Sequence, residues 1–373
     1  VYTRALSAEE IIAIAAESDS VTDSVALTVN TLNDAPTFSV GDGVVTEFGA
    51  TAGYYTKDLM IQGNGQYVVV GVSNDGGNNM VSVSRFNEDG SLDTSFGTDG
   101  RGTTSLGTGD TVNAGTLQPD GKILVVGATN STSPIESAVW RFNADGSVDT
   151  SFGTNGAVTL EFTSTSSEYL RDVVVQPDGQ IVVVGYANSG DEVMTVARLN
   201  PDGSLDNSFN GGSLLRLDLG AGDDDARSVA VQEDGKILLA GTAGSGTTSD
   251  FAIVRLNPDG SLDTDFATNG VFKHDVNGEF DGLTGVAVDD QGRIVASGTS
   301  RVGAASSESV VLRLDTDGTF DTSFNGTGIN VMSLGFPHES IDDMALQDDG
   351  KIVLTGTSYA SFGINDVSVV RLN

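Results

Sequence analysis

The chain has 373 residues, of which 52 are acidic and 18 are basic, so its formal net charge at pH 7 is −34. This charge excludes a surface for nucleic acid or anionic membranes, because such partners are bound by clustered lysines and arginines. The absence of cysteine excludes a disulfide framework. No apolar run approaches the roughly 20 residues of a membrane-spanning helix. The 48 glycines, 38% hydrophobic content and recurring apolar runs favour a globular all-β protein.

Residues 7–17, SAEEIIAIAAE, form the first predicted element, a short helix. Ser7 and Glu10 have the spacing of a capping box, and apolar residues follow them. The segment VYTRALSAEEI resembles the closing strand and helix of laminin-G-like domains. DSVALTVNTLNDAPTF resembles the last strand and linker of cadherin-like repeats in bacterial surface adhesins. These resemblances imply that residues 1–36 are the tail of a preceding region plus a linker, within a longer polypeptide.

One repeated pattern dominates residues 37–373. Six segments of the type LQPDGKILVVG end on a glycine, at intervals of 56, 58, 56, 57 and 58 residues. The closing glycines are Gly71, Gly127, Gly185, Gly241, Gly298 and Gly356. A fixed period of this length indicates one supersecondary unit stacked on itself. Within each unit, two apolar runs that flank a turn such as PDG predict a β-hairpin.

A third and a fourth strand complete the predicted unit. The third strand leads into a motif such as RLNPDGSLDTSFG, and an apolar residue lies ten positions after the phenylalanine of that motif. Four short strands in each of six units predict a six-bladed β-propeller, which protects sheet edges by radial repetition. The sixth unit lacks its fourth strand, whereas residues 43–48 have the pattern of one. We therefore expect this N-terminal strand to complete the last blade and close the ring.

The alternation of these two motifs resembles the delta-60 repeat family of bacterial β-propellers. The resemblance covers residues 37–373 and implies a propeller domain over that range. It also implies an extracellular or cell-surface location, because the family occurs in large secreted or surface proteins. The resemblance implies no defined activity, and a fold does not determine a function.

Each repeat also carries an arginine in its third strand, and in the first five repeats an aspartate follows eight residues later. We predict that the two side chains form an ion pair that holds the long connection after the third strand, a structural role. The pairs are Arg85 with Asp93, Arg141 with Asp149, Arg198 with Asp206, Arg255 with Asp263, and Arg313 with Asp321.

The loops of the repeats fall into two classes. The hairpin turns and the N-x-D-G-S-L-D-x-S-F connections keep the glycine and aspartate residues that tight turns require. The loops before the first strand and those between the second and third strands differ in every repeat. Antiparallel order places both variable sets at the same end of a blade. Because variable loops on a rigid scaffold are common binding sites, we expect a glycan or protein ligand there; solvated loops without a ligand are the alternative.

Candidate binding residues lie at this end, where they would surround the mouth of a central channel. Their mixture of charges, amides and tyrosines suits a polar or sugar ligand, and a closed network of salt bridges is the alternative. They are Tyr54, Tyr55, Lys57, Asn113, Glu168, Tyr169, Arg171, Arg227, Glu339 and Asp342. Asp58, Asp172 and Asp343 are candidate ligands of Ca²⁺, which prefers oxygen ligands. The sequence requires no cofactor and leaves calcium open.

Catalysis has little support in the sequence, which contains two histidines and no cysteine. It also lacks GxSxG, HExxH and phosphate-binding-loop motifs. We expect a non-catalytic binding or scaffold module of a large bacterial surface or secreted protein, with a monomeric propeller joined to other domains. One alternative is a calcium-dependent, lactonase-like hydrolase with a metal in the channel, and another is a purely structural spacer. Glu168 and Glu339 also leave open a carboxylate pair for glycoside cleavage.

Overall fold

The computed structural model describes residues 54–131, 133–188, 190–244, 248–303, 306–333, 337–359 and 366–372, and two short strands near the N-terminus. These strands, β1 (Leu27–Thr28) and β2 (Thr37–Phe38), pair antiparallel. The predicted helix at 7–17 and the predicted closing strand at 43–48 lie outside the described residues. Over the ranges given above, no helix is long and apolar enough to span a membrane.

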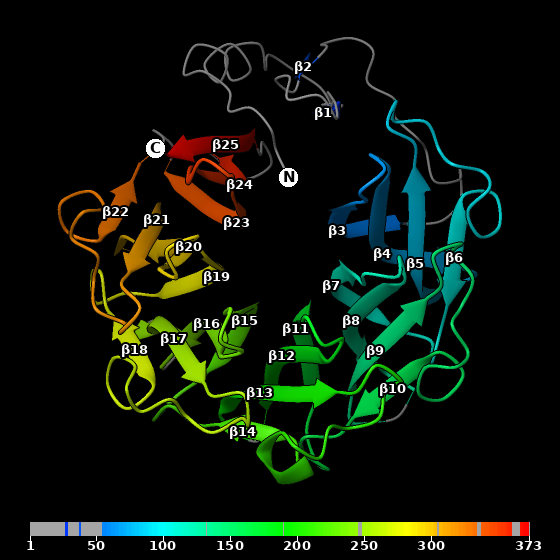
Figure 1. Cartoon of the computed structure of the whole chain (residues 1–373), viewed down its shortest axis with the longest axis horizontal. Helices are drawn as coiled ribbons and strands as arrows, with labels where there is room; N and C mark the ends of the chain where they lie inside the picture. Colours follow the sequence, from blue (N-terminus) through cyan, green and yellow to red (C-terminus); the bar gives the residue numbers. More distant parts are fainter. Residues whose placement is uncertain are drawn as a thin grey trace. The chain divides into compact units, whose positions relative to one another are not determined.

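The remaining strands form six antiparallel sheets, whose strands follow chain order (Figure 1). The first three sheets contain β3 (Tyr54–Ile61), β4 (Tyr67–Asp75), β5 (Asn78–Phe86) and β6 (Arg101–Thr104); β7 (Thr111–Leu117), β8 (Ile123–Thr129), β9 (Glu136–Phe142) and β10 (Ala157–Leu160); and β11 (Glu168–Val175), β12 (Ile181–Asn188), β13 (Glu192–Leu199) and β14 (Leu215–Leu217). The last three contain β15 (Asp225–Val231), β16 (Ile237–Ala243), β17 (Asp250–Leu256) and β18 (Val271–His274); β19 (Asp281–Val288), β20 (Ile294–Arg301), β21 (Ser307–Leu314) and β22 (Ile329–Met332); and β23 (His338–Leu346), β24 (Ile352–Tyr359) and β25 (Asp366–Leu372). One short 3₁₀ helix, Asn210–Gly212, precedes β14.

The predicted all-β fold with repeated four-stranded sheets is confirmed. Five sheets have four strands, and the sixth has three within the described part of the chain. The hairpin turns form as the PDG pattern predicts. In the second sheet, for example, Gly121 has a φ of 83° and donates its backbone N–H to Gln118 O at 2.9 Å, which is a conformation that glycine adopts without strain.

The chain divides into two compact units, one containing Asp19–Val183 and Arg198–Asp206, and the other containing Val184–Ala197 and Asn207–Asn373. In the first unit, alternate valines of β4, such as Val68 and Val70, share a buried cluster with Val125 of β8 and Trp140 of β9. In the second unit, Leu238 of β16 shares such a cluster with residues of β20 and β21, and Val295 of β20 shares another with residues of β24. Strands with both faces buried in this way read as continuous apolar runs.

Steric crowding explains why the repeats end their second apolar run on a glycine. The first strand of a sheet carries a β-bulge, which pushes a backbone carbonyl toward the second strand. A Cβ atom added to Gly127 would lie 1.9 Å from Thr111 O, and one added to Gly241 would lie 1.8 Å from Asp225 O. Only glycine therefore fits opposite the bulge.

The five predicted arginine–aspartate ion pairs are present in the structure. The distances from arginine Nε to aspartate Oδ2 are 2.8 Å for Arg85–Asp93, 2.7 Å for Arg141–Asp149, 2.6 Å for Arg198–Asp206, 2.6 Å for Arg255–Asp263 and 2.7 Å for Arg313–Asp321. Hydrogen bonds from Ser95 and Arg85 lower the pKa of Asp93 to about 2. The same arrangement, with Ser323 and Arg313, lowers the pKa of Asp321 to about 2. The aspartates are therefore held as carboxylates within the connections.

The same arginines also link successive sheets. Arginine Nη1 atoms donate hydrogen bonds to backbone carbonyls in the turn of the next repeat: Arg85 to Ala144, Arg141 to Pro201, and Arg255 to Thr316. Arginine also stacks on the phenylalanine of its own motif, as for Arg141, whose Cζ lies 4.3 Å from the Phe152 ring centroid. The conserved composition of this motif across the repeats thus reflects a structural link.

Candidate functional site

Four of the predicted binding residues are the extra residues of β-bulges. The register of the first strand shifts between Thr56 and Asp58, Val112 and Ala114, Ala226 and Ser228, Leu283 and Gly285, and Ile341 and Asp343. The residues that these shifts leave unpaired are Lys57, Asn113, Arg227, Thr284 and Asp342. Because a bulge re-aims the side chain it carries, the fold gives these positions directions that a regular strand would not.

Two of the bulge residues contact the neighbouring sheet. Asn113 Nδ2 donates a hydrogen bond to Leu170 O at 2.6 Å, and Thr284 Oγ1 donates one to Ile341 O at 2.8 Å. The amide of Asn113 therefore holds β7 to β11, a structural role that its position in the sequence did not indicate.

In two sheets, the residue after the bulge also forms a hydrogen bond to the neighbouring sheet. Asp58 accepts the N–H of Leu59 at 2.7 Å and that of Gly115, in the next sheet, at 2.9 Å. Ser228 Oγ accepts the N–H of Val286 at 3.2 Å in the same way. Because burial outweighs these bonds, the pKa of Asp58 is raised. Its carboxylate is thus occupied by backbone donors.

The other two candidate calcium ligands resemble Asp58 locally. Asp172 accepts the N–H of Val173, and Asp343 accepts that of Met344, each at 2.7 Å. Within the described ranges, no three His, Cys, Asp or Glu side chains form a group that could hold a metal. The assignment of Asp58, Asp172 and Asp343 as calcium ligands stays a prediction.

A buried carboxylate recurs at the start of each first strand from the second sheet onward. These residues, at most 2% exposed, are Asp110, Glu168, Asp224, Asp281 and Glu339. Four of them accept a backbone N–H from the preceding loop: Asp110 from Leu106 at 2.8 Å, Glu168 from Phe162 at 2.8 Å, Asp224 from Leu219 at 2.6 Å, and Asp281 from Val276 at 2.7 Å. Burial raises the pKa of Glu168, Asp224 and Asp281.

The buried carboxylates correct the interpretation of Glu168 and Glu339 as ligand-binding or catalytic residues. A ligand in solution cannot reach a side chain that is 1% or 2% exposed, and the Glu168 carboxylate already binds the loop before its own strand. The sequence does carry the signal, because these acidic residues recur at spacings of 58, 56, 57 and 58 residues, the spacings of the closing glycines.

Backbone hydrogen bonds join the variable loops of adjacent sheets. Each bond joins two adjacent sheets. One partner lies at or just before the start of a first strand, and the other lies at or just before the start of the third strand of the preceding sheet. The donor–acceptor pairs are Glu168 N with Ile135 O at 3.0 Å, Asp224 N with Glu192 O at 2.9 Å, Asp281 N with Ser249 O at 2.7 Å, and Ser307 N with Pro337 O at 2.9 Å. Loops of unrelated sequence are thus held in one repeated arrangement.

Arg227, in β15, belongs to a cluster with Phe280, in the loop before β19, and Arg301, at the end of β20, all within the second unit. Its Cζ lies 5.7 Å from the ring centroid of Phe280, and the Cζ of Arg301 lies 5.7 Å from the same centroid. Arg227 Nε also donates to Asp225 Oδ2 at 3.1 Å. The sequence singled out Arg227 alone, because Phe280 lies in a loop, and Arg301 at a strand end, that match no other repeat.

The roles of the remaining predicted binding residues stay predictions. Lys57 and Asp342 are exposed, and Tyr169 and Arg171 are half-buried. Asp342 Oδ1 accepts a hydrogen bond from Ser340 Oγ at 3.1 Å. The side chain of Tyr54 lies outside the described part of the structure.

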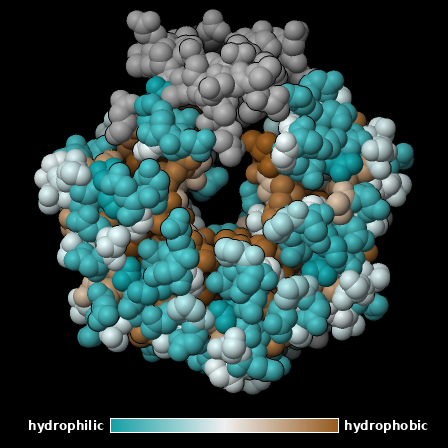
Figure 2. Space-filling model, viewed as in Figure 1, coloured by the Kyte–Doolittle hydropathy of each residue, from teal (hydrophilic) through white to brown (hydrophobic). Residues whose placement is uncertain are grey.

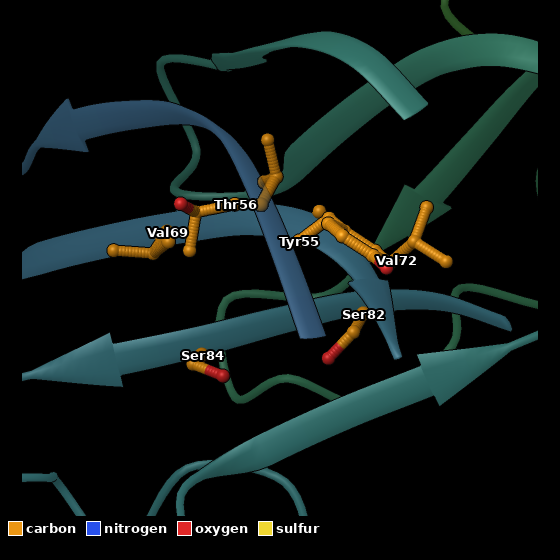
Figure 3. A pocket seen from close by; sticks show the side chains of 8 residues that line it. Tyr55, Thr56, Val69, Val72, Ser82 and Ser84 are labelled. Carbon is orange, nitrogen blue, oxygen red and sulfur yellow. The ribbon is translucent and has the colours of Figure 1, made fainter. Parts of the chain in front are cut away.

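A pocket lies on one face of the first sheet (Figure 3). Its lining includes Thr56 and Tyr55 of β3, and Ser82 and Ser84 of β5. In the second sheet, the positions of the two serines are taken by Ala138 and Trp140, which are buried against the first sheet. The pocket thus lies on a face that serves for sheet packing elsewhere in the repeats. Tyr55 is 66% exposed beside it.

Hydrophilic residues cover most of the described surface in the view of Figure 2. The hydrophobic residues appear mainly in narrow bands between them. The part of the surface described in this view therefore suits a polar ligand better than an apolar one.

Six segments of the chain match the model of one protein family, described as a domain of unknown function (DUF5122) β-propeller. They are residues 62–96, 118–152, 176–209, 232–266, 292–324 and 347–373. Together with the six antiparallel sheets, they define a β-propeller repeat protein. The chain belongs to the DUF5122 β-propeller family. The delta-60 designation and the laminin-G-like and cadherin-like resemblances stay predictions.

The chain is similar to solved structures, one of which has a TM-score above 0.5 and agrees with the fold. A protein of unknown function from Dyadobacter fermentans DSM 18053 is 14% identical, with a TM-score of 0.52, over 85% of this chain and 94% of that chain. An endo-1,4-β-xylanase from Bacteroides thetaiotaomicron VPI-5482 is 12% identical, with a TM-score of 0.40, over 87% of this chain and 100% of that chain. No curated protein matches the chain. At these identities the likeness concerns the fold alone.

Proposed function

We propose that the chain is a non-catalytic binding module of a large bacterial surface or secreted protein, and that it presents its variable loops to a glycan or a protein. The observation that carries the proposal is the set of backbone hydrogen bonds between adjacent variable loops. These bonds fix the loop backbones, so that side chains can differ from sheet to sheet on a rigid support. Rigid support with variable side chains is the usual design of a binding surface.

The distribution of carboxylates supports binding rather than catalysis. The buried acids at the first strands are bonded to loop backbone, and the aspartates of the long connections are bonded to arginine. Their roles are therefore structural. The strongly negative net charge is consistent with a soluble module outside the cell, because self-repulsion keeps long proteins apart.

A glycan array probed with the full chain tests the proposal, once with calcium and once with a chelator. We expect binding that weakens in Tyr169→Ala or Arg171→Gln, at the variable-loop end. The control Lys351→Gln, in a hairpin turn at the opposite end, should bind normally.

Other outcomes, of the array and of separate assays with lactones and proteins, would change the assignment. Loss of binding in chelator would add calcium to the site. Calcium-dependent turnover of a lactone would favour the hydrolase, and the absence of any glycan or protein ligand would favour the spacer.

A further inference from the structure

The cluster of Arg227, Phe280 and Arg301 brings together two positive charges on a protein of net charge −34. Both guanidinium carbons lie 5.7 Å from one ring centroid, so the distance between them is at most twice that value. Arg301 is exposed and forms no ion pair with another described residue. Arg227 uses only Nε for its contact with Asp225, and its side chain is 30% exposed. Both arginines thus have donors available to a ligand.

The loop that carries Phe280 is fixed before any ligand binds. Phe280 O accepts the N–H of Arg301 at 2.8 Å, and Asn277 Nδ2 donates to Ser300 Oγ at 3.2 Å. The buried Asp281 carboxylate accepts the N–H of Val276 at 2.7 Å. A site held in this way loses little freedom when a ligand binds.

Gly282 makes room for the cluster. A Cβ atom there would lie 2.8 Å from Arg227 Nη1 and 3.0 Å from a ring atom of Phe280. Gly282 pairs with the residue that follows the closing glycine of its repeat. The residues in this position in other sheets are Thr111 in the second sheet, Asp225 in the fourth and Ser340 in the sixth. The glycine of the fifth sheet therefore allows Arg227 to lie beside the ring.

We propose that Arg227, Phe280 and Arg301 bind the uronate residue of an acidic oligosaccharide. This assignment rests on the proposed function, because it names the ligand class of the loop surface. Guanidinium groups match the two oxygens of a carboxylate, and an aromatic ring contacts the apolar C–H face of a sugar. A uronate carries both features in one rigid unit. An acidic peptide side chain has the carboxylate without an apolar ring face beside it. The half-buried Glu279, next to Phe280 in the sequence, disfavours a dense polyanion.

Calorimetric titration of the full chain with trigalacturonate tests the site, and the methyl ester of the same trimer tests its charge requirement. We expect the acid to bind and the ester to bind at least about tenfold more weakly. Arg227→Gln and Arg301→Gln should each weaken binding of the acid by about tenfold or more. Phe280→Leu and Gly282→Ala should weaken it as well. The control Arg216→Gln removes an exposed arginine of β14 and should leave binding unchanged.

Thermal unfolding followed by circular dichroism shows whether each variant is folded. Equal binding of the acid and its ester, or unchanged binding in Arg301→Gln, would overturn the uronate site. If a neutral glycan or a protein binds the loops while these variants behave normally, the proposed function stands and the uronate assignment is wrong. If no glycan or protein binds at all, both are wrong.

Discussion

Asp149 offers a direct test of the ion pair that holds each long connection. Its carboxylate accepts hydrogen bonds from Arg141 Nε at 2.7 Å, Lys122 Nζ at 2.9 Å and Ser151 Oγ at 2.6 Å. The side chains of Arg141 and Asp149 are only 5% and 6% exposed. Breaking a buried ion pair by removing one charge costs about 3–5 kcal/mol. Asp149→Asn keeps the shape and an acceptor for Ser151, so we expect a loss of about 3 kcal/mol.

Urea unfolding measures this loss, and the single tryptophan, Trp140, lies beside Arg141 as a fluorescent reporter. The matched control is Asp120→Asn, because Asp120 is 58% exposed and lies 3.9 Å from Lys122. An exposed pair of this kind contributes about 0–1 kcal/mol. Equal unfolding free energies for the two variants would refute the role of the buried pair.

The effect of Asp149→Asn should also depend on pH. The pKa of Asp149 is lowered in the folded protein, by hydrogen bonds from Ser151 and Lys122 that outweigh its burial. A lowered pKa stabilises the folded state above the unfolded value of about 3.9. The difference in unfolding free energy between wild type and Asp149→Asn should therefore be constant above about pH 4 and become smaller below it.

Three further predictions concern the bulge, a buried acid and the N-terminal strand. Gly127→Ala should destabilise the protein by about 3 kcal/mol in urea unfolding, because the new Cβ would meet backbone, whereas Gly63→Ala, with open space around it, should be nearly neutral. Burial raises the pKa of Glu168, so the free energy of unfolding of wild type should increase relative to that of Glu168→Gln as the pH falls from 7 to 4.5. Parallel curves of unfolding free energy against pH would contradict this. Deletion of residues 37–48 should lower the melting temperature by exposing a sheet edge, and an unchanged value would disprove closure by that segment.

The repeat period, the strand order and the ion pairs could be predicted from the sequence because their causes are local. A turn needs its glycine, and Arg141 and Asp149 are joined through one short connection. Comparing the repeats with one another also separated the two kinds of loop.

The candidate site could be predicted only in part, because burial and inter-sheet contacts depend on packing. Glu168 follows a loop of variable sequence and was therefore predicted to be accessible, yet it begins β11 and is 1% exposed. Asn113 looked like a ligand residue, yet its donor binds Leu170 of the next sheet. Phe280, just before β19, and Arg301, at the end of β20, are joined by a backbone hydrogen bond, and no spacing in the sequence indicates that Arg227 lies beside them.

The links made by the repeated arginines run from one repeat to the following one. Each repeat therefore has to match only its immediate neighbours, and the surfaces joined by these arginines lie at the end opposite the variable loops. A repeat with new loops can replace an old one without a change in those surfaces. Duplication or exchange of whole repeats is thus a simple route by which such a protein can acquire a new ligand while it retains its stability.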